Sequence, residues 1–404
     1  MTPVRPIRHT IPLDEARQLL AAAAVPLDRT ERIAITDANG RVIAARVISS
    51  EDVPPFDRAA MDGYAVIAED TFGATAGEPA ALRLIDRVFT GQITSTTVTR
   101  GTCIEVATGA PLPDGADAVV MAEETDRDGD AVRIMTPVYP KQHIGRRGAD
   151  ISAGQTIFAP GVVLTPSRIG ALAAIGLRDI EVYAKPRVAI ASTGNEVVEP
   201  GQLLEPGHIY DINRFTLRTI AEAHGGETTV YPPVPDDLES LARTIASTAD
   251  CDILVFSGGS SVGERDLLVD AIEGAGELIF HGIAVKPGKP TAFGRIGRRL
   301  VFGMPGYPTS CLSNAYILLV PLLRTLARLP EYQPRTISVP LARRVVSTTG
   351  RHQFYTVRVV DGTAVPAFKA SGDITSMAHA DGYIEIPAQT DIVDAGQIVD
   401  VKLF

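Results

Sequence analysis

The order of apolar and polar positions divides the chain into one helix, two strand-rich stretches and one stretch in which strands and helices alternate. Residues 13–24 have the spacing of an amphipathic helix, with Asp14 and Glu15 in its first turn. From residue 31 to about residue 139, short β-prone runs alternate with Gly, Pro and Asp, which predicts an all-β module. The predicted strands are residues 32–36, 41–47, 64–67, 81–88, 102–106, 118–121 and 131–134.

The stretch 185–329 has the alternation of a parallel sheet with helices on both faces, which predicts a doubly wound α/β domain. Its predicted strands include residues 187–192, 228–231 and 251–256, and its predicted helices are residues 213–224, 238–248, 266–273 and 309–329. After Pro330, strand-like runs return at residues 335–339, 355–360, 383–386 and 398–403. These runs predict a separate small β domain.

With 404 residues the chain is too long for one ordinary domain, and the patterns predict four. Between residues 140 and 184 the strand pattern weakens and a helix begins at Pro166, so we expect this segment to rejoin the N-terminal helix in space. The predicted domains are an N-terminal linking domain (1–30 plus 140–184), an inserted β module (31–139), the α/β domain (185–329) and a C-terminal β domain (330–404).

Composition narrows the class of protein. A hydrophobic content of 45% with 21% charged residues is typical of a soluble globular protein, and the net charge of −10 argues against a nucleic-acid surface. The three cysteines, Cys103, Cys251 and Cys311, have no metal-binding spacing and favour a reduced compartment. The N-terminus has no apolar signal core, and the apolar stretch 315–323 is too short to span a membrane. We therefore expect a cytoplasmic protein without nucleic-acid or membrane partners.

Two strand ends in the α/β domain are followed by residues suited to an anion and a metal. The glycine-rich loop from Ser257 to Asp266 follows an apolar run, so its N–H groups and hydroxyls can approach a phosphate. Another loop, from Ser192 to Glu196, follows an earlier strand. Ligands of open parallel sheets bind at these carboxyl ends. If the two strands are near neighbours, Glu196 and Asp266 face one crevice, where two carboxylates suit Mg²⁺. Each residue has an alternative role. Glu196 would be solvated in an ordinary turn, and Asp266 would cap a helix, although for Asp266 we favour the role of a ligand.

Further loops offer charged groups in stiff turns. Lys286 and Lys289 stand among prolines and a glycine and suit an oxyanion, although an exposed basic turn is the alternative. The segment 303–310 adds backbone donors, or is only a helix-entry turn. In the β module, segments 54–64 and 108–117 include Asp62, and the later loop 146–150 includes Asp150; ordinary turns and surface ion pairs are the alternatives there.

Seven of these segments occur in an order that resembles the molybdopterin molybdenumtransferase family (MoeA), which includes the E domain of gephyrin. The segments are residues 55–65, 108–117, 147–151, 192–196, 257–266, 286–290 and 303–308. The resemblance spans essentially the whole chain and is weakest in motifs after Pro330. It implies an elongated homodimer of four-domain subunits with a molybdopterin-binding-like α/β domain, whose site is completed by β-module loops of the partner subunit. It also implies a Mg²⁺-dependent reaction of molybdate with adenylylated molybdopterin that releases AMP, and a possible partner in the molybdopterin-adenylylating enzyme.

The resemblance also implies roles for individual residues. Asp62, Asp150, Glu196 and Asp266 would be catalytic, with Glu196 and Asp266 also holding the metal. The implied substrate-binding positions are Thr108, Ser192, Thr193, Gly194, Asp236, Asp237, Ser257, Gly258, Gly259, Ser261, Gly263, Lys286, Lys289, Pro305, Pro308 and Ser371. Two positions depart from the family pattern: some members have a cation where Gly282 stands, and many have Asn where Tyr307 stands.

The implied chemistry agrees with the residues present. Cleavage of a phosphoanhydride needs charge neutralisation more than a covalent nucleophile, and the sequence has no convincing Cys–His or Ser–His–Asp arrangement. Two other functions remain open: adenylylation of molybdopterin by ATP, and a non-catalytic scaffold that binds the pterin.

Overall fold

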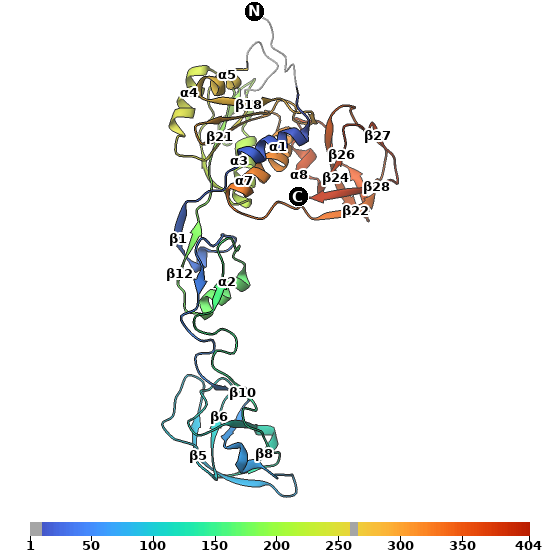
Figure 1. The fold of residues 1–404 in the computed structure, drawn as a ribbon. Helices are drawn as coiled ribbons and strands as arrows, with labels where there is room; N and C mark the ends of the chain where they lie inside the picture. The colour runs from blue at the N-terminus through green and yellow to red at the C-terminus, as the bar shows by residue number, and fades with distance from the viewer. Residues whose placement is uncertain (1–9, 259–265) are drawn as a thin grey trace, which may run out of the picture. The chain divides into compact units, whose positions relative to one another are not determined.

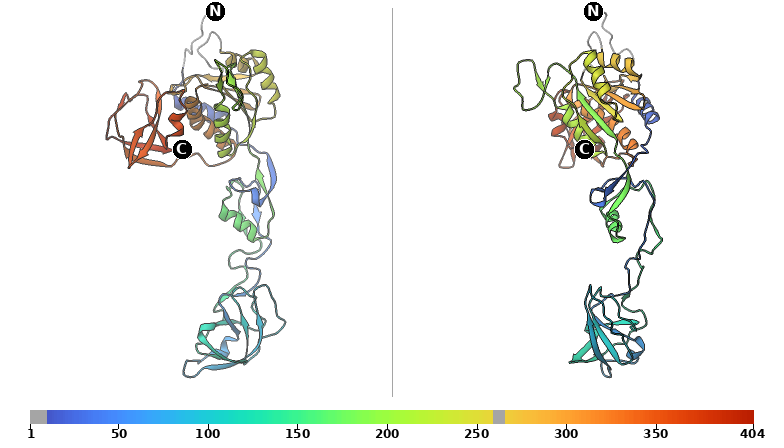
Figure 2. Two further views of the ribbon diagram at one scale, coloured as in Figure 1. Left: turned by 180° about the vertical axis from the view of Figure 1, so that it is seen from behind. Right: turned by 90° about the vertical axis from the view of Figure 1, so that its left-hand side faces the viewer.

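The computed structural model describes residues 10–258 and 266–404, and the chain forms two compact units. Unit 1 comprises Met1–Glu31, Gly40–Val42 and Tyr183–Phe404, and unit 2 comprises Arg32–Asn39 and Ile43–Val182. The elements of each unit can be followed in Figures 1 and 2.

Unit 1 is built on a six-stranded sheet with the order β16-β13-β17-β21-β20-β18. Its strands are β13 (Arg187–Ser192), β16 (Glu227–Val230), β17 (Ile253–Ser257), β18 (Glu277–His281), β20 (Ala292–Ile296) and β21 (Arg299–Met304). The first four in the sheet order are parallel, while β20 and β18 are antiparallel to their neighbours. The inner strands are apolar throughout because helices cover both of their faces.

Alternation along β13 shows how both faces are covered. Val188 and Ile190 pack with α1 (Leu13–Ala23) and α3 (Asn213–Ala223) in one core, whereas Ala189 and Ala191 pack on the other face. That second core includes α4 (Leu238–Ser247) and α5 (Leu267–Ala275). The predicted doubly wound α/β domain is therefore confirmed.

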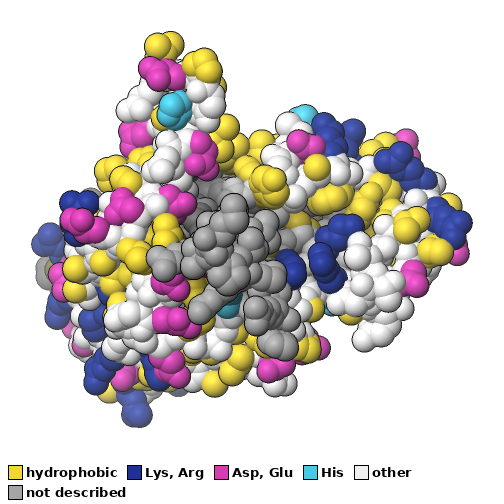
Figure 3. All heavy atoms as spheres, turned by 90° about the horizontal axis from the view of Figure 1, so that it is seen from above, with side chains coloured by type: hydrophobic (Ala, Val, Ile, Leu, Met, Phe, Trp, Pro, Cys, Tyr) yellow, Lys and Arg dark blue, Asp and Glu magenta, His cyan; other side chains and the backbone are white. Residues whose placement is uncertain are grey.

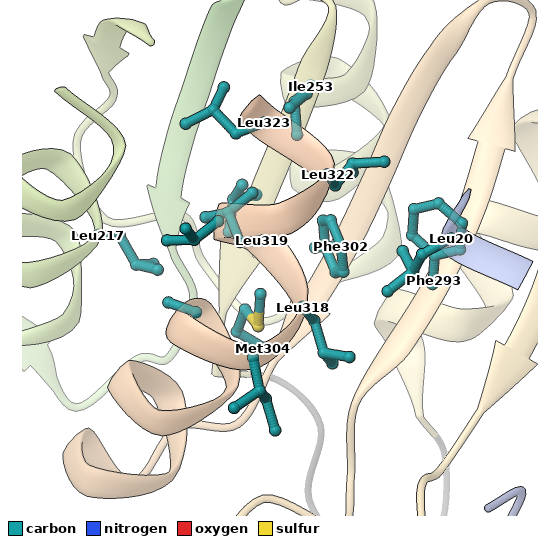
Figure 4. Close-up of a cluster of buried hydrophobic side chains, with 14 of the residues drawn as sticks. Leu20, Leu217, Ile253, Phe293, Phe302, Met304, Leu318, Leu319, Leu322 and Leu323 are labelled. Atoms are coloured by element: carbon teal, nitrogen blue, oxygen red, sulfur yellow. The ribbon is translucent and has the colours of Figure 1, made fainter. Parts of the chain in front are cut away.

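A long helical segment fills the first core, where its leucines lie against Phe302 and Phe293 (Figure 4). It consists of α6 (Pro308–Asn314), a π-helical turn η4 (Ala315–Leu319) and α7 (Val320–Leu326). Pro321 has no N–H to donate to the helix, and the wider π-helical turn η4 before it accommodates the missing hydrogen bond. Within the described residues only this segment is long and apolar enough to span a membrane, and 72% of it is buried inside unit 1.

The C-terminal strands of unit 1 form a second sheet with the order β19-β24-β26-β28-β22. Its strands are β19 (Val285–Lys286), β22 (Thr336–Pro340), β24 (His352–Val360), β26 (Gly382–Ile386) and β28 (Ile398–Leu403), and β25 (Thr363–Pro366) also pairs with β24. Val357, Ile384 and Val401 are buried in its core. The predicted C-terminal β region is present, and β19 attaches it to the Lys286 turn.

Unit 2 contains a six-stranded sheet with the order β7-β4-β6-β5-β9-β8. Its strands are β4 (Gly63–Val66), β5 (Ala80–Val88), β6 (Thr102–Val106), β7 (Ala118–Met121), β8 (Thr125–Asp128) and β9 (Ala131–Ile134). Two apolar cores pack on it, one around Val120 and Ile134 and one around Ile104 and Val119. The predicted module of short strands is present. A third core joins β2 (Val47–Ile48), β11 (Thr156–Phe158) and α2 (Pro166–Ala174).

The predicted packing of the N-terminal helix with residues 140–184 differs from the structure, although the N–H of Ala184 donates to the carbonyl of Arg29 (2.8 Å). Leu13, Ala16 and Leu20 of α1 are buried against the α/β sheet of unit 1. The segment around Leu164 and Leu172 instead packs with residues such as Ile43. The apolar stripe of α1 requires a partner surface, but it does not specify which one. The four domain boundaries themselves stay a prediction.

Candidate functional site

Three loops begin side by side at the carboxyl edge of the parallel sheet in unit 1. Ser192 at the end of β13 lies opposite Ser257 at the end of β17, which lies opposite Met304 at the end of β21. The segments after these residues, 193–196, the one that begins at Gly258, and 305–307, therefore start next to one another. This edge is where open α/β sheets bind ligands.

Gly258 allows these loops to approach closely. Its φ of +98° is a conformation that glycine adopts readily, and a Cβ there would lie 2.3 Å from the carbonyl oxygen of Thr193. A Cβ at Gly306 would in turn lie 3.4 Å from Cα of Gly258. Backbone therefore packs on backbone at the edge of the sheet.

The N–H groups at the start of these loops have partners inside the protein. Thr193 donates to the carbonyl of Ser257 (2.8 Å), Gly194 to that of Val234 (3.3 Å) and Gly258 to that of Met304 (3.1 Å). They therefore do not point at an anion, contrary to what the glycine-rich pattern predicted for Gly258. The expected positions Gly259, Ser261 and Gly263 lie outside the described residues.

The carboxylates expected at this edge lie close enough to influence one another. The pKa of Asp236 is raised by desolvation and then by the negative charges of Glu196, Asp266 and Asp237. The N–H of Asp236 also donates to Oδ1 of Asn195 (3.2 Å), which joins the segment after β16 to the one after β13. Glu196 and Asp266 therefore both lie within electrostatic range of Asp236, and their place in one crevice stays a prediction.

Two of these carboxylates are also helix caps. Asp237 caps α4 through the N–H of Ser240 (2.7 Å), and this hydrogen bond lowers its pKa. Asp266 caps α5, with Oδ1 accepting from the N–H of Val269 (3.3 Å), while its Oδ2 lies 3.1 Å from Nε2 of His281. Asp266 is therefore a helix cap, the alternative that the sequence analysis favoured less, and its role as a metal ligand stays a prediction.

The carboxylates suit a Mg²⁺ ion that is shared with a substrate better than one whose ligands all come from the protein. No group of three or more His, Cys, Asp or Glu residues in the described part of the chain has the geometry of a metal site. Mg²⁺, however, commonly takes one or two carboxylates and completes its shell with water and substrate phosphates. Desolvation, followed by the negative charges of Glu196, Asp266 and Asp237, raises the pKa of Asp236, and a cation beside these carboxylates would neutralise part of that charge.

The lysine turn is anchored to the helix and to the C-terminal strands. Nζ of Lys286 donates to Oγ1 of Thr348 (2.7 Å), and Nδ2 of the buried Asn314 donates to the carbonyl of Gly288 (2.8 Å). Lys289 is partly buried in the same turn. The parallel pairing of β19 with β24 places His352 opposite Val285 and Gln353 opposite Lys286.

Ser371 and the predicted prolines lie at the start of α6. The carbonyl of Ser371 accepts from the N–H of Thr309 (3.1 Å), Pro308 is the first residue of α6, and Pro305 is buried. The C-terminal region therefore contributes to the same neighbourhood, as expected. On the face shown in Figure 3, Asp and Glu side chains lie on both sides of the view, and Lys and Arg occur over the C-terminal strands as well as along the outer edge of the α/β side.

In unit 2, Asp62 is held by Thr108. Oδ1 of Asp62 accepts from both the N–H (2.7 Å) and the hydroxyl (2.9 Å) of Thr108, and these hydrogen bonds lower the pKa of Asp62. Asp62 also lines an open pocket of about 200 Å³ together with Tyr64, Phe89 and Glu105. The two residues predicted from separate loops are thus in direct contact.

Asp150 lies in a second cluster of unit 2. It is exposed, and its N–H donates to the carbonyl of Val53 (2.9 Å). The neighbouring Arg147 donates from its N–H to Asp57 (2.7 Å) and from Nε to Asp52 (2.6 Å). Pairing of β3 (Arg58–Ala59) with β10 (Ile144–Gly145) joins these loops. Asp52 was not predicted, and its only signal is a carboxylate two residues before a Pro-Pro pair.

A buried polar segment beneath the loops of unit 1 was also missed. The hydroxyl of Ser192 donates to Oδ1 of Asp211 (2.8 Å), whose Oδ2 lies 3.2 Å from Nε of Arg214. Nδ2 of Asn213 donates to the carbonyl of Gly306 (2.8 Å). The sequence signal for this segment is the pair of opposite charges Asp211 and Arg214, three residues apart at the start of an amphipathic helix.

Three family models match the chain in order, and together they define a multidomain molybdopterin-binding class. They are the MoeA N-terminal region (domain I and II) over residues 11–176, the probable molybdopterin binding domain over residues 189–325 and the MoeA C-terminal region (domain IV) over residues 338–404. The second of these covers the parallel sheet and its loops.

Relatives match over their whole length. Molybdopterin molybdenumtransferase 2 of Mycobacterium tuberculosis is 33% identical over 399 residues, covering 96% of this chain and 98% of its own. The molybdopterin molybdenumtransferase of Haemophilus influenzae is 31% identical over 401 residues, covering 97% and 98%. Two structures of molybdopterin biosynthesis MoeA proteins from Pyrococcus horikoshii have TM-scores of 0.85 and 0.80 at 40% and 32% identity, each covering 98% of this chain and at least 99% of theirs. The chain belongs to the MoeA family, so the resemblance is confirmed.

Proposed function

We propose that this chain is a molybdopterin molybdenumtransferase of molybdenum cofactor biosynthesis, which inserts molybdate into adenylylated molybdopterin and releases AMP with Mg²⁺. The observation that carries the proposal is the full-length similarity to molybdopterin molybdenumtransferases, and the pKa of Asp236, raised by desolvation and then by the charges of Glu196, Asp266 and Asp237, agrees with it. Crowded carboxylates disfavour folding, so they point to a cation and a phosphorylated ligand rather than to a passive scaffold. Full-length relatives named as molybdenumtransferases do not favour the adenylyltransferase alternative.

In this proposal the residues of the chain bind and orient the substrates. Bound Mg²⁺ supplies charge neutralisation at the phosphoanhydride, with Glu196 and Asp266 holding it. Lys286 and Lys289 are placed in a fixed turn, where their ammonium groups contact a phosphate or molybdate oxyanion. The buried hydroxyl of Thr193 has no hydrogen-bond partner within the described structure, so it is a further candidate donor.

The proposal includes a homodimer whose sites combine unit 1 of one copy with unit 2 of the other. Its support is the family resemblance together with exposed apolar side chains near β14 (Val197–Val198), β15 (Ile209–Tyr210) and α3. Leu203 is 86% exposed, Ile209 56% and Phe215 49%, and a second copy would cover such a surface.

Two further parts of the proposal concern the surroundings of the protein. An adenylylating enzyme has to supply the substrate, so it is a natural transient partner. A cytoplasmic location agrees with the three free cysteines. Burial raises the pKa of Cys103 to about 12 and also raises that of Cys311, so neither thiol is poised for reaction.

An AMP-release assay tests the proposal. Purified protein with adenylylated molybdopterin, Mg²⁺ and molybdate is expected to release AMP in proportion to the cofactor formed, and a chelator is expected to stop it. A parallel reaction with ATP and molybdopterin tests the adenylyltransferase alternative and is expected to give no pyrophosphate. Recovery of unaltered adenylylated ligand from the first reaction would overturn the transferase.

A further inference from the structure

A buried ion pair lies beneath the three loops of unit 1. Asp211 and Arg214 are only 4% and 6% exposed, and Nε of Arg214 lies 3.2 Å from Oδ2 of Asp211. Arg214 also reaches Oε1 of Glu199 (3.0 Å) and the carbonyl of Tyr231 (2.9 Å). Buried ion pairs often stabilise a fold no better than apolar residues of the same volume, so stability alone does not account for this pair.

The pair fixes the direction of a hydrogen-bond chain through two serines. Ser192 uses its single hydroxyl hydrogen to donate to Oδ1 of Asp211 (2.8 Å). Oγ of Ser192 lies 3.1 Å from Oγ of Ser257, so the hydrogen of that second bond comes from Ser257. Both serines are 2% exposed. Neither hydroxyl is therefore left to donate to an anion, which corrects the donor role expected for Ser257.

The same short segment also holds the third loop. Nδ2 of Asn213 donates to the carbonyl of Gly306 (2.8 Å), and Asn213 is 7% exposed. Residues 211–214 thus contact the start of the loop after β13 directly, the start of the loop after β17 through Ser192, and the loop after β21 through Gly306.

We propose that residues 211–214 are the positioning element of the transferase site. Asp211, with Arg214 beside it, orients Ser192 and Ser257, while Asn213 holds Gly306, so the starts of the three loops keep one arrangement when substrate binds. This proposal rests on the proposed function, because it assigns the order of these loops to that reaction. Positioning matters in such sites because a displacement of about 1 Å at a reacting group costs on the order of 100-fold in rate.

Single and double serine variants test the chain. Ser192→Ala and Ser257→Ala are each expected to lower kcat for AMP release about tenfold, with KM within about twofold of the unsubstituted protein. The double variant is expected to lose no more than the worse single variant, because both serines belong to one chain. Multiplied losses, or losses that follow the melting temperature, would overturn the proposal.

A conservative pair of substitutions separates positioning from folding. Arg214→Lys keeps a positive charge beside Asp211 and is expected to retain most of kcat, whereas Arg214→Met is expected to lower kcat about tenfold. Equal kcat in the two variants would contradict the proposal. The melting temperature of each variant is measured alongside.

The matched control lies at the opposite edge of the same sheet. Arg299 and Thr248 are 8% and 2% exposed, and NH1 of Arg299 donates to Oγ1 of Thr248 (3.0 Å). Thr248→Ala is expected to lower the melting temperature about as much as Ser192→Ala while leaving kcat unchanged. A drop in kcat for Thr248→Ala equal to that of Ser192→Ala would overturn the proposal.

Equilibrium binding of AMP keeps the two proposals distinguishable. If the unsubstituted protein binds AMP but does not turn over, the transferase fails, while the serine variants still test positioning through their AMP affinities. Affinity losses that do not add in the double variant support the chain. AMP affinity and kcat unchanged in both single variants would overturn positioning and leave the transferase intact.

Discussion

Asp236 has the clearest electrostatic signature of any single residue at the site. Desolvation, followed by Glu196, Asp266 and Asp237, raises its pKa in the folded protein. A raised pKa means that the folded state disfavours the ionised form. The stability contributed by the protonated form is therefore complete below the unfolded value of about 3.9 and is lost as the pH rises through the folded value.

Replacing Asp236 by Asn is expected to stabilise the protein at neutral pH, because it removes one of the crowded negative charges. The gain is small, about 1–2 °C in melting temperature, because the carboxylate is partly screened by water. Melting curves across the acid range are expected to show the gain shrinking as the pH falls towards the unfolded pKa. Millimolar Mg²⁺ is expected to stabilise the unsubstituted protein more than the variant. A variant that is less stable at every pH would contradict the crowding argument.

The serines at the strand ends show the limit of sequence at the residue scale. The pattern predicted that both serines stand at the ends of apolar strands, and the structure shows that these strands are neighbours. Their hydrogen-bond partners could not be predicted, because Asp211 belongs to a later segment whose path depends on the folded sheet. The same holds for the N–H of Gly258, which is taken by the carbonyl of Met304 on the neighbouring strand.

At the scale of elements, α5 and its cap separate two roles of Asp266. Asn caps a helix as well as Asp, whereas Ala does not. Asp266→Ala is expected to reduce the free energy of unfolding by about 1 kcal/mol, and Asp266→Asn by much less. Both are expected to lower AMP release at least about tenfold, because both remove the charge proposed to hold Mg²⁺. Urea unfolding measures the effect on stability, and the AMP assay measures the effect on activity. If the Asp266→Asn variant is active, Asp266 serves only as the helix cap of α5.

Periodicity predicted most elements of the chain but not all. The strand predicted at residues 187–192 is β13, and the helix predicted at 213–224 is α3 with one residue fewer. The run 41–47 is β-prone yet contributes only the start of β2, because Val42 and Ile43 are buried without a strand partner of regular register. Local preference indicates an extended chain there, and only neighbouring segments decide whether a ladder forms.

At the scale of the whole molecule, the sequence predicts the fold of each region better than it predicts which regions pack against one another. The strand-end rule predicts that Glu196 and Asp266 face one crevice, because parallel strands share one edge, and the structure shows that shared edge at Ser192 and Ser257. The place of α1 was predicted wrongly, because an amphipathic stripe fits any apolar surface of suitable width. Asp62 and Asp150 lie in unit 2, while Glu196 and Asp266 lie in unit 1. A site that needs all four therefore has to combine both units.

Mixing two inactive variants tests whether those units come from different copies. In an intersubunit site, a heterodimer of Asp62→Asn and Asp266→Asn has both defects in one site and none in the other. After subunit exchange at equal concentration, half of the dimers are mixed, so AMP release is expected to recover to about a quarter of the unsubstituted rate. The matched control mixes Asp62→Asn with Asp150→Asn, which share unit 2 and are expected not to restore activity. Each site in the control mixture still contains one defective unit 2. Recovery of activity in the control mixture would therefore rule out the intersubunit site. So would a lack of recovery in the first mixture after subunit exchange has been demonstrated.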